Sequence, residues 1–366
     1  MPHILHVVAD GAPGGGTTAV LGLCSDLQSQ GFRTSLITQR DSYGFQTGQA
    51  MKLEARGLDF FRSRFDRNVP KRLQTLIAEL SPDLVHVHGA RAGHAFCSRP
   101  LRDLPSKLVY TVHGYHFLKR PLAWRALGWV AEKRIAKRAD QVVFVSKNDR
   151  NIADRFRILS TDPQSERKCS TIYNGIDPHD LDATRAARPS YDLVFAGRMH
   201  LQKNPSFLVD IMAELAADNV TLLMVGGGEL EAEVRAYAER RGVASRITFK
   251  GALTRAEALA ALASGKIYVF PSLWEGLPIG PIEAMYYGLP VVASAIGGTD
   301  EVVEHEVNGF LLSTFDARSY ASAIRRLLRD PQLYAGYSAA GRRRVDSLFL
   351  RKSCTANYRS VYDRLL

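Results

Sequence analysis

The 366-residue sequence has few cysteines and no long uninterrupted apolar run. Its four cysteines, Cys24, Cys97, Cys169 and Cys354, show neither metal-ligand spacing nor a disulfide framework, so we expect reduced thiols in a cytosolic protein. The least charged stretch, residues 276–299, contains one charged residue but three prolines, a composition that excludes a membrane-spanning helix. The N-terminus lacks a basic segment and a cleavage site, so no signal peptide is expected.

The sequence also lacks a solenoid repeat and any low-complexity tract. Because 46% of its residues are hydrophobic, it has enough apolar material for packed cores, and its length favours two domains. The net charge of +11 is uneven: residues 1–187 contain 27 basic and 18 acidic residues, whereas residues 188–366 contain 21 and 19. The excess indicates an anionic partner for the first half, which the charge alone does not identify.

Short apolar runs rich in β-branched residues alternate with helix-compatible stretches along the chain. The expected strands are 3–8, 34–38, 84–88, 107–112, 141–145, 193–196, 220–225, 267–270 and 290–293. This alternation predicts two doubly wound α/β domains, each with a parallel sheet covered on both faces.

We expect an N-terminal domain over residues 1–187 and a C-terminal domain over 188–345, with the polar stretch 182–190 as the linker. A C-terminal helix, 346–366, is expected to pack back on the N-terminal domain.

Ligands of doubly wound sheets bind where strands end and helices begin. After the first strand, Gly14, Gly15 and Gly16 permit close backbone approach, and the following helix would present free N–H groups to an anion. A tight strand-to-helix turn explains the same glycines equally well.

Histidines lie at the ends of two expected strands of the first half. His86 and His88 alternate on one strand, but a third metal ligand at suitable spacing is not evident, so we favour packed or rim histidines over a metal site. His113 stands between a strand and Gly114, where an active-site loop is expected, and its imidazole can exchange a proton near neutral pH.

Two cations follow the first strand of the second half. Arg198 and Lys203, with Gly197 beside the arginine and a helix starting at Pro205, are suited to binding a diphosphate. A solvated loop is the alternative.

Two carboxylates follow a later strand, where few other charges are present. Glu275 is expected in a loop and Glu283 on the next helix. A buried carboxylate needs a partner, and the vicinal hydroxyls of a ribose or hexose would satisfy it. Carboxylates that cap backbone amides are the structural alternative.

Within PSLWEGLPIGPIEAMYYGLPVVAS the two glutamates are spaced as E-x7-E. Together with other motifs along the sequence, this segment makes nearly the whole chain resemble the retaining glycosyltransferases of family 4. The other motifs are TVHG, FVSK, YNGID, GRMHLQKN, VGGGE and Gly297-Gly298 followed by Glu301. The resemblance implies the GT-B fold, with two Rossmann-like domains facing across a cleft. It also implies a nucleotide-sugar donor bound mainly by the C-terminal domain, an acceptor bound mainly by the N-terminal domain, and no required metal or other cofactor.

The resemblance also assigns roles to residues. Arg198 and Lys203 would bind the donor diphosphate and stabilise its developing charge, and Glu283 would hold the ribose. Glu275 would orient the transferred sugar and His113 would lie near it. The donor would further contact Gly15, Gly16, Gly197, Gly276, Leu277, Pro278 and Ile279. Leu277-Pro278 replaces the aromatic residue and glycine that are frequent in the family, and Pro278 removes one N–H.

These features predict a retaining, metal-independent hexosyltransferase that moves a hexose or N-acetylhexosamine, with UDP-sugar favoured, to a glycan or polyprenyl-diphosphate-linked acceptor in surface polysaccharide biosynthesis. A sugar-nucleotide epimerase of the same architecture and a GDP-mannose-dependent mannosyltransferase are the alternatives. Nucleic-acid binding is not expected, because no nucleic-acid module is recognisable.

The basic excess gathers in residues 119–138 and 52–72, each with seven Lys and Arg. In the first of these, an apolar stripe through Trp124, Gly128, Ala131 and Ile135 is expected on a helix. The stripe either packs on the sheet beside solvated cations or helps to attach a cytoplasmic protein to the anionic inner face of the plasma membrane.

Overall fold

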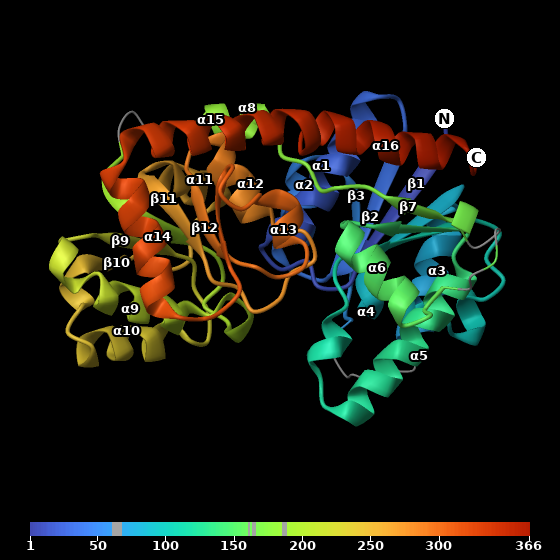
Figure 1. Ribbon diagram of the computed structural model, residues 1–366. Helices are drawn as coiled ribbons and strands as arrows, with labels where there is room; N and C mark the ends of the chain where they lie inside the picture. Colours follow the sequence, from blue (N-terminus) through green and yellow to red (C-terminus); the bar gives the residue numbers. More distant parts are fainter. Residues whose placement is uncertain (61–67, 160–161, 163–165, 185–188) are drawn as a thin grey trace. The chain divides into compact units, whose positions relative to one another are not determined.

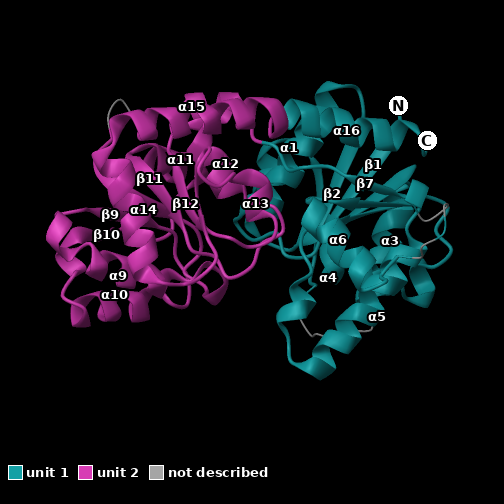
Figure 2. Ribbon diagram, in the orientation of Figure 1, with its two compact units in different colours: residues 1–175, 351–366 teal, residues 176–350 magenta. Residues whose placement is uncertain are grey.

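The computed structural model of the chain describes residues 1–60, 68–159, 162, 166–184 and 189–366. The chain forms two compact units, one of Met1–Gly175 with Arg351–Leu366 and the other of Ile176–Leu350 (Figures 1 and 2). The expected boundary after residue 187 and part of the expected linker lie outside the described residues. Across the ranges described, no helix is both long and apolar enough to cross a bilayer.

Unit 1 contains a seven-stranded parallel sheet in the order β3-β2-β1-β4-β5-β6-β7. The strands are β1 His3–Val8, β2 Arg33–Gln39, β3 Glu54–Leu58, β4 Leu84–His88, β5 Lys107–Val112, β6 Gln141–Phe144 and β7 Cys169–Thr171. The helices are α1 Gly15–Ser29, α2 Tyr43–Ala50, α3 Val69–Leu80, α4 Gly89–Ala95, α5 Leu122–Arg138, α6 Lys147–Arg155 and α16 Arg351–Asp363.

The strands of unit 1 send alternate side chains to opposite faces of the sheet. On β1, Leu5 packs in one cluster with Leu73 of α3, whereas its neighbour Ile4 packs in another with Leu27 of α1 and Tyr362 of α16. Both clusters are closed to solvent, as expected for a parallel sheet covered on two faces.

Polar contacts fix α16 to α1. Asp26 of α1 pairs with Arg351 at 3.2 Å and accepts a hydrogen bond of 2.7 Å from the Thr355 hydroxyl. The last sixteen residues therefore complete the sheet unit that the first residues begin.

Unit 2 contains a six-stranded parallel sheet in the order β10-β9-β8-β11-β12-β13. The strands are β8 Tyr191–Ala196, β9 Leu222–Val225, β10 Ile247–Phe249, β11 Gly265–Phe270, β12 Val291–Ser294 and β13 Gly309–Leu312. The helices are α8 Pro178–Asp182, α9 Pro205–Glu214, α10 Glu231–Arg240, α11 Arg255–Ala263, α12 Ile279–Tyr286, α13 Thr299–Val302, α14 Ala317–Arg329 and α15 Pro331–Leu348.

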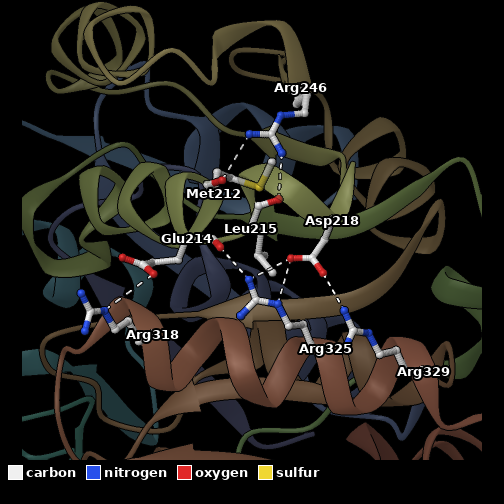
Figure 3. Close-up of polar contacts among 8 residues, drawn as sticks. All are labelled: Met212, Glu214, Leu215, Asp218, Arg246, Arg318, Arg325 and Arg329. Atoms are coloured by element: carbon white, nitrogen blue, oxygen red, sulfur yellow. Dashed lines mark hydrogen bonds and ion pairs between the residues drawn. The ribbon is translucent and has the colours of Figure 1, made fainter.

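Arginines join α14 to the end of α9 (Figure 3). Asp218 accepts hydrogen bonds from Arg325 at 2.8 Å and from Arg329 at 3.0 Å, and Arg246 donates to the Leu215 carbonyl at 3.0 Å. Arg325 also donates at 2.6 Å to the carbonyl of Glu214, the last residue of α9. Because carbonyls at a helix C-terminus attract cations, these contacts fix the C-terminal end of α9. Helix α9, whose N-terminus follows the expected diphosphate loop, is thereby held at its C-terminal end.

The two doubly wound parallel sheets confirm the expected fold class. Each strand predicted from the sequence is present, and the four that were missed, β3, β7, β10 and β13, are the edge strands of the two sheets.

The interpretation that the apolar stripe of α5 packs on the sheet is wrong for the first half of the helix. Ile135 is buried as expected, but Trp124 is 43% exposed, because the core contacts of α5 come from its C-terminal turns. Leu122 and Leu127 are also exposed, at 79% and 61%. The single acid of this stretch, Glu132, is buried, and burial raises the pKa of its carboxyl to about 8.

Candidate functional site

The carboxyl ends of β8, β9, β11 and β12 meet at one edge of the unit 2 sheet, and most of the predicted donor residues follow them. After β8, Gly197 donates a backbone hydrogen bond of 2.9 Å to Val225, and the Arg198 side chain is exposed. Lys203 ends a short 3₁₀ helix, Leu201–Lys203, and α9 begins at Pro205 as predicted. The loop therefore places two cations just before a helix N-terminus, the arrangement that suits an anion.

Two loops pack tightly at this edge because the residue at their contact is a glycine, which has no side chain. Gly226 has a φ of 119°, and a Cβ at this position would lie 2.0 Å from the Gly197 carbonyl oxygen. The loop after β9 therefore lies directly on the loop that carries Arg198.

Lys203 and Glu275 form an ion pair across neighbouring strands. The Lys203 Nζ lies 2.6 Å from the Glu275 Oε1, and the two side chains are 19% and 8% exposed. The same Nζ lies 4.8 Å from the centre of the Phe270 ring. Gln202 strengthens the junction, because its carbonyl accepts a hydrogen bond from the Leu273 N–H and its side chain donates to the Trp274 carbonyl, each at 2.8 Å.

Glu283 is paired with a residue that the sequence analysis missed. It lies on α12 with its side chain 8% exposed, and its carboxylate accepts a hydrogen bond from Arg255 of α11. Arg255 stands 28 positions earlier on a different helix, so no spacing in the sequence links it to Glu283. Both predicted glutamates are thus paired with cations of unit 2.

The remaining predicted donor contacts form the turn into α12. Gly276, Leu277 and Pro278 are buried, and Ile279 begins the helix. Gly298, after β12, supports this turn: its φ is 84°, and a Cβ there would lie 1.6 Å from the Gly276 carbonyl oxygen. The backbone of two loops therefore sets the position of the turn.

In unit 1, the glycine loop leads into α1 as expected. Helix α1 begins at Gly15, and the Thr17 hydroxyl donates to the Ala12 carbonyl at 2.7 Å. A Cβ added at Gly14 or Gly16 would have nothing within 4 Å. The tight turn is thus present, and the room beside these two glycines is compatible with the predicted approach to an anion.

His113 follows β5 and is the end of a chain of histidines. Its Nε2 lies 3.2 Å from the Nδ1 of His88, and the Nε2 of His88 lies 3.1 Å from the Nδ1 of His6. Burial lowers the pKa of His113 to about 4 and that of His6 to about 3, so both rings are neutral at pH 7. A neutral His113 offers one donor and one acceptor.

His6 is the third histidine that the sequence analysis did not find beside His86 and His88. It pairs in register with His86 across β1 and β4, and the three rings bring one nitrogen each within 4.8 Å of one another. Both ring nitrogens of His86 are already hydrogen-bonded, to the hydroxyls of Tyr362 at 2.6 Å and Thr111 at 2.7 Å. This geometry is that of a hydrogen-bonded cluster, because a metal ion would have to displace one of those hydroxyls.

The chain has two doubly wound units, with glycine turns and polar side chains at the carboxyl ends of the strands. It therefore falls in the class of two-domain α/β proteins that bind ligands at these edges. The profile described as Glycosyl transferases group 1 matches residues 180–344, and that described as Glycosyltransferase Family 4 matches residues 13–180. The chain belongs to these glycosyltransferases and has the GT-B fold.

Curated relatives and solved structures agree with this family. The UDP-Gal:alpha-D-GlcNAc-diphosphoundecaprenol alpha-1,3-galactosyltransferase of Escherichia coli is 29% identical over 71% of this chain and 70% of its own length. The D-inositol 3-phosphate glycosyltransferase of Jonesia denitrificans is 28% identical over 77% and 72%. The HepE protein of Anabaena, solved with UDP-glucose, has a TM-score of 0.83 at 20% identity over the full length of both chains.

The support that Gly298 gives to the turn into α12 is testable through stability. We expect Gly298→Ala to lower the free energy of unfolding by about 1 to 3 kcal/mol, because the new methyl group forces the Gly276 carbonyl to move and the backbone keeps a positive φ. Urea denaturation followed by circular dichroism measures the change.

Gly336→Ala is the matched control, since Gly336 is exposed on α15 and a Cβ there would have nothing within 4 Å. Alanine should leave stability unchanged or raise it by up to about 1 kcal/mol. Equal stability of the two variants would show that Gly298 does not support the turn.

Proposed function

We propose that this glycosyltransferase is a retaining, metal-independent enzyme that moves a hexose or N-acetylhexosamine from a UDP-sugar to a glycan or lipid-linked glycan in surface polysaccharide biosynthesis. The observation that carries the proposal is the set of two cations and two carboxylates at one edge of the unit 2 sheet. Lys203 is paired with Glu275 at 2.6 Å, and Arg198 is exposed on the loop before α9. Glu283 is nearly buried against Arg255.

The choice of UDP and of a lipid-linked acceptor has support from relatives. HepE was solved with UDP-glucose, and the Escherichia coli relative uses UDP-Gal and a sugar on diphosphoundecaprenol. An acceptor of this kind combines a glycan with an anionic diphosphate and an apolar chain, which fits the basic excess of residues 1–187.

Arg198 and Lys203 would compensate the charge of the leaving group. When the bond between the sugar C1 and the β-phosphate oxygen breaks, negative charge accumulates on the diphosphate, and two fixed cations at the strand ends stabilise it. No metal is then needed for this step.

In front-face transfer the acceptor hydroxyl oxygen bonds to C1 on the side from which the diphosphate leaves. The departing phosphate oxygen takes the hydroxyl proton, so the products are the glycoside and the protonated nucleoside diphosphate. Glu275 would orient the sugar, Glu283 would hold the ribose hydroxyls, and His113 would contact the transferred sugar.

A panel of nucleotide sugars tests the proposed function. The purified protein is incubated with UDP- and GDP-linked sugars, each with and without lipid-linked acceptors. We expect UDP release that depends on an acceptor. Conversion of the donor without acceptor would favour a sugar-nucleotide epimerase, and activity with GDP-mannose alone would favour a mannosyltransferase.

The two glutamates should differ in what they bind. Glu283→Gln should weaken the binding of free UDP and of UDP-sugar alike, because a ribose is common to both. Glu275→Gln should leave free UDP binding intact yet lower turnover, since it contacts only the sugar. Titration calorimetry measures both affinities, and an equal loss of UDP affinity in the two variants would contradict this division of roles.

The two cations should act mainly on kcat. Arg198→Ala and Lys203→Ala each remove charge that stabilises the departing diphosphate, so we expect kcat to fall by about 10²-fold or more. EDTA should leave the wild-type enzyme active. Strict dependence on a divalent ion would show that these side chains do not replace a metal.

We also propose that α5 attaches the protein to an anionic membrane. Leu122, Trp124 and Leu127 are exposed on its first half, and Lys133, Arg134 and Lys137 are exposed on its second half. The exposed apolar side chains suit the interface, and each basic residue near an anionic surface contributes about 1 kcal/mol. The second basic stretch, 52–72, lies partly outside the described residues.

Liposome flotation tests the attachment. Binding should require anionic lipid, weaken with salt, and fall when four cations are neutralised together, Lys133, Arg134, Lys137 and Arg138. The control neutralises four exposed cations of unit 2, namely Arg240, Arg241, Lys250 and Arg318. Equal recovery on zwitterionic vesicles, or an equal loss of binding in the control, would contradict the attachment and favour the interpretation that the cations on α5 are merely solvated.

A further inference from the structure

The chain of His6, His88 and His113 has one buried end and one half-buried end. His6 is fully buried on β1, and its Nε2 has no hydrogen-bond partner among the residues that the structure describes. His113 is half-buried in the loop after β5. The bonds that join the three rings are 3.1 and 3.2 Å long.

The hydrogen-bonded chain of three histidines admits only two arrangements of protons. Burial lowers the pKa of His88 well below its ordinary value, as it does for His6 and His113, so all three rings are neutral. A neutral imidazole has one N–H and one bare nitrogen. His88 therefore donates to one neighbour and accepts from the other, and the choice made at one end of the chain determines the other end.

The two arrangements differ at the buried Nε2 of His6. If His113 donated from Nε2, His88 would donate to His6, and His6 would carry its proton on an Nε2 that has no acceptor. The reverse arrangement leaves a bare lone pair there. Buried N–H groups without an acceptor are rarer in proteins than acceptors that lack a donor, so the environment of His6 favours the reverse arrangement.

We propose that His6 and His88 are positioning residues that hold His113 as its Nδ1–H tautomer. In this arrangement His6 donates from Nδ1 to His88, and His88 donates from Nδ1 to the Nε2 of His113. Nδ1 of His113 is then the ring nitrogen left for a ligand, and it is a hydrogen-bond donor.

The consequence for catalysis rests on the proposed function, in which His113 contacts the transferred sugar. A donating Nδ1–H would bind a sugar oxygen. His113 would then not act as a general base, because its only bare nitrogen accepts from His88.

The tautomer can be measured in the free protein. With ¹⁵N-labelled histidine, long-range proton–nitrogen correlation spectra distinguish Nδ1–H from Nε2–H, and the His113 signals are assigned by their loss in His113→Gln. We expect Nδ1–H at His113 at neutral pH. Nε2–H at His113 would overturn the proposal.

Two substitutions of His88 separate positioning from mere packing. Asn places its amide near the position of the imidazole Nδ1, whereas Gln places its amide near that of Nε2. His88→Asn should therefore keep the Nδ1–H tautomer of His113, and His88→Gln should change it. The same tautomer in both variants would overturn the proposal. If His88→Gln does not fold, His6→Asn and His6→Gln make the same comparison one bond further away.

Tyr362→Phe is the matched control. It removes the hydroxyl bonded to His86 at 2.6 Å but leaves the three-histidine chain intact, so the His113 tautomer should not change. A change as large as that of His88→Gln would show that the tautomer reports general packing, which would overturn the assignment to His6 and His88.

Kinetics link the tautomer to the reaction. We expect His88→Gln to lower kcat by about tenfold and His88→Asn by less than about threefold, with the affinity for free UDP unchanged in both. Equal losses in the two variants would contradict a positioning role. If the protein turns over no UDP-sugar, the proposed function fails while the spectra still decide the tautomer, so the two failures are distinguishable.

Discussion

The ion pair between Lys203 and Glu275 is the interaction on which the candidate donor site depends. Strands β8 and β11 are neighbours in the unit 2 sheet, so the loops that follow them emerge side by side at one edge. A carboxylate with only 8% of its side chain exposed needs a partner, and the lysine supplies it at 2.6 Å. This pair and the Gln202 hydrogen bonds hold the cation loop and the glutamate loop together.

The same constraint explains how the site could receive a charged donor. Glu275 and Glu283 are each paired with a cation, and the Arg198 side chain is exposed on the loop after β8. In the proposed function, the diphosphate of the donor would bring negative charge to the cations, and the hydroxyls of its ribose and sugar would donate to the carboxylates. Each side chain would then exchange its present partner for a complementary one. Glycines at 226 and 298 keep the loop backbones close enough for this arrangement.

The sequence predicted the inner strands and the strand-end motifs because both leave local signals. Buried parallel strands read as β-branched runs, and Pro205 and Gly15 mark helix starts. The edge strands β3, β7, β10 and β13 were missed because each is short or only partly buried, which weakens the apolar pattern. Arg255 and His6 were missed because their partners lie on other elements, and only the sheet register and helix packing bring them together.

Proton NMR during turnover tests the central claim that this edge supports retaining transfer from a nucleotide sugar. An α-linked UDP-sugar is mixed with enzyme and lipid-linked acceptor, and the anomeric signals are followed at early times. The account predicts free UDP and a new α-anomeric signal that grow together. A β-anomeric product, or an epimerised donor without release of UDP, would contradict it.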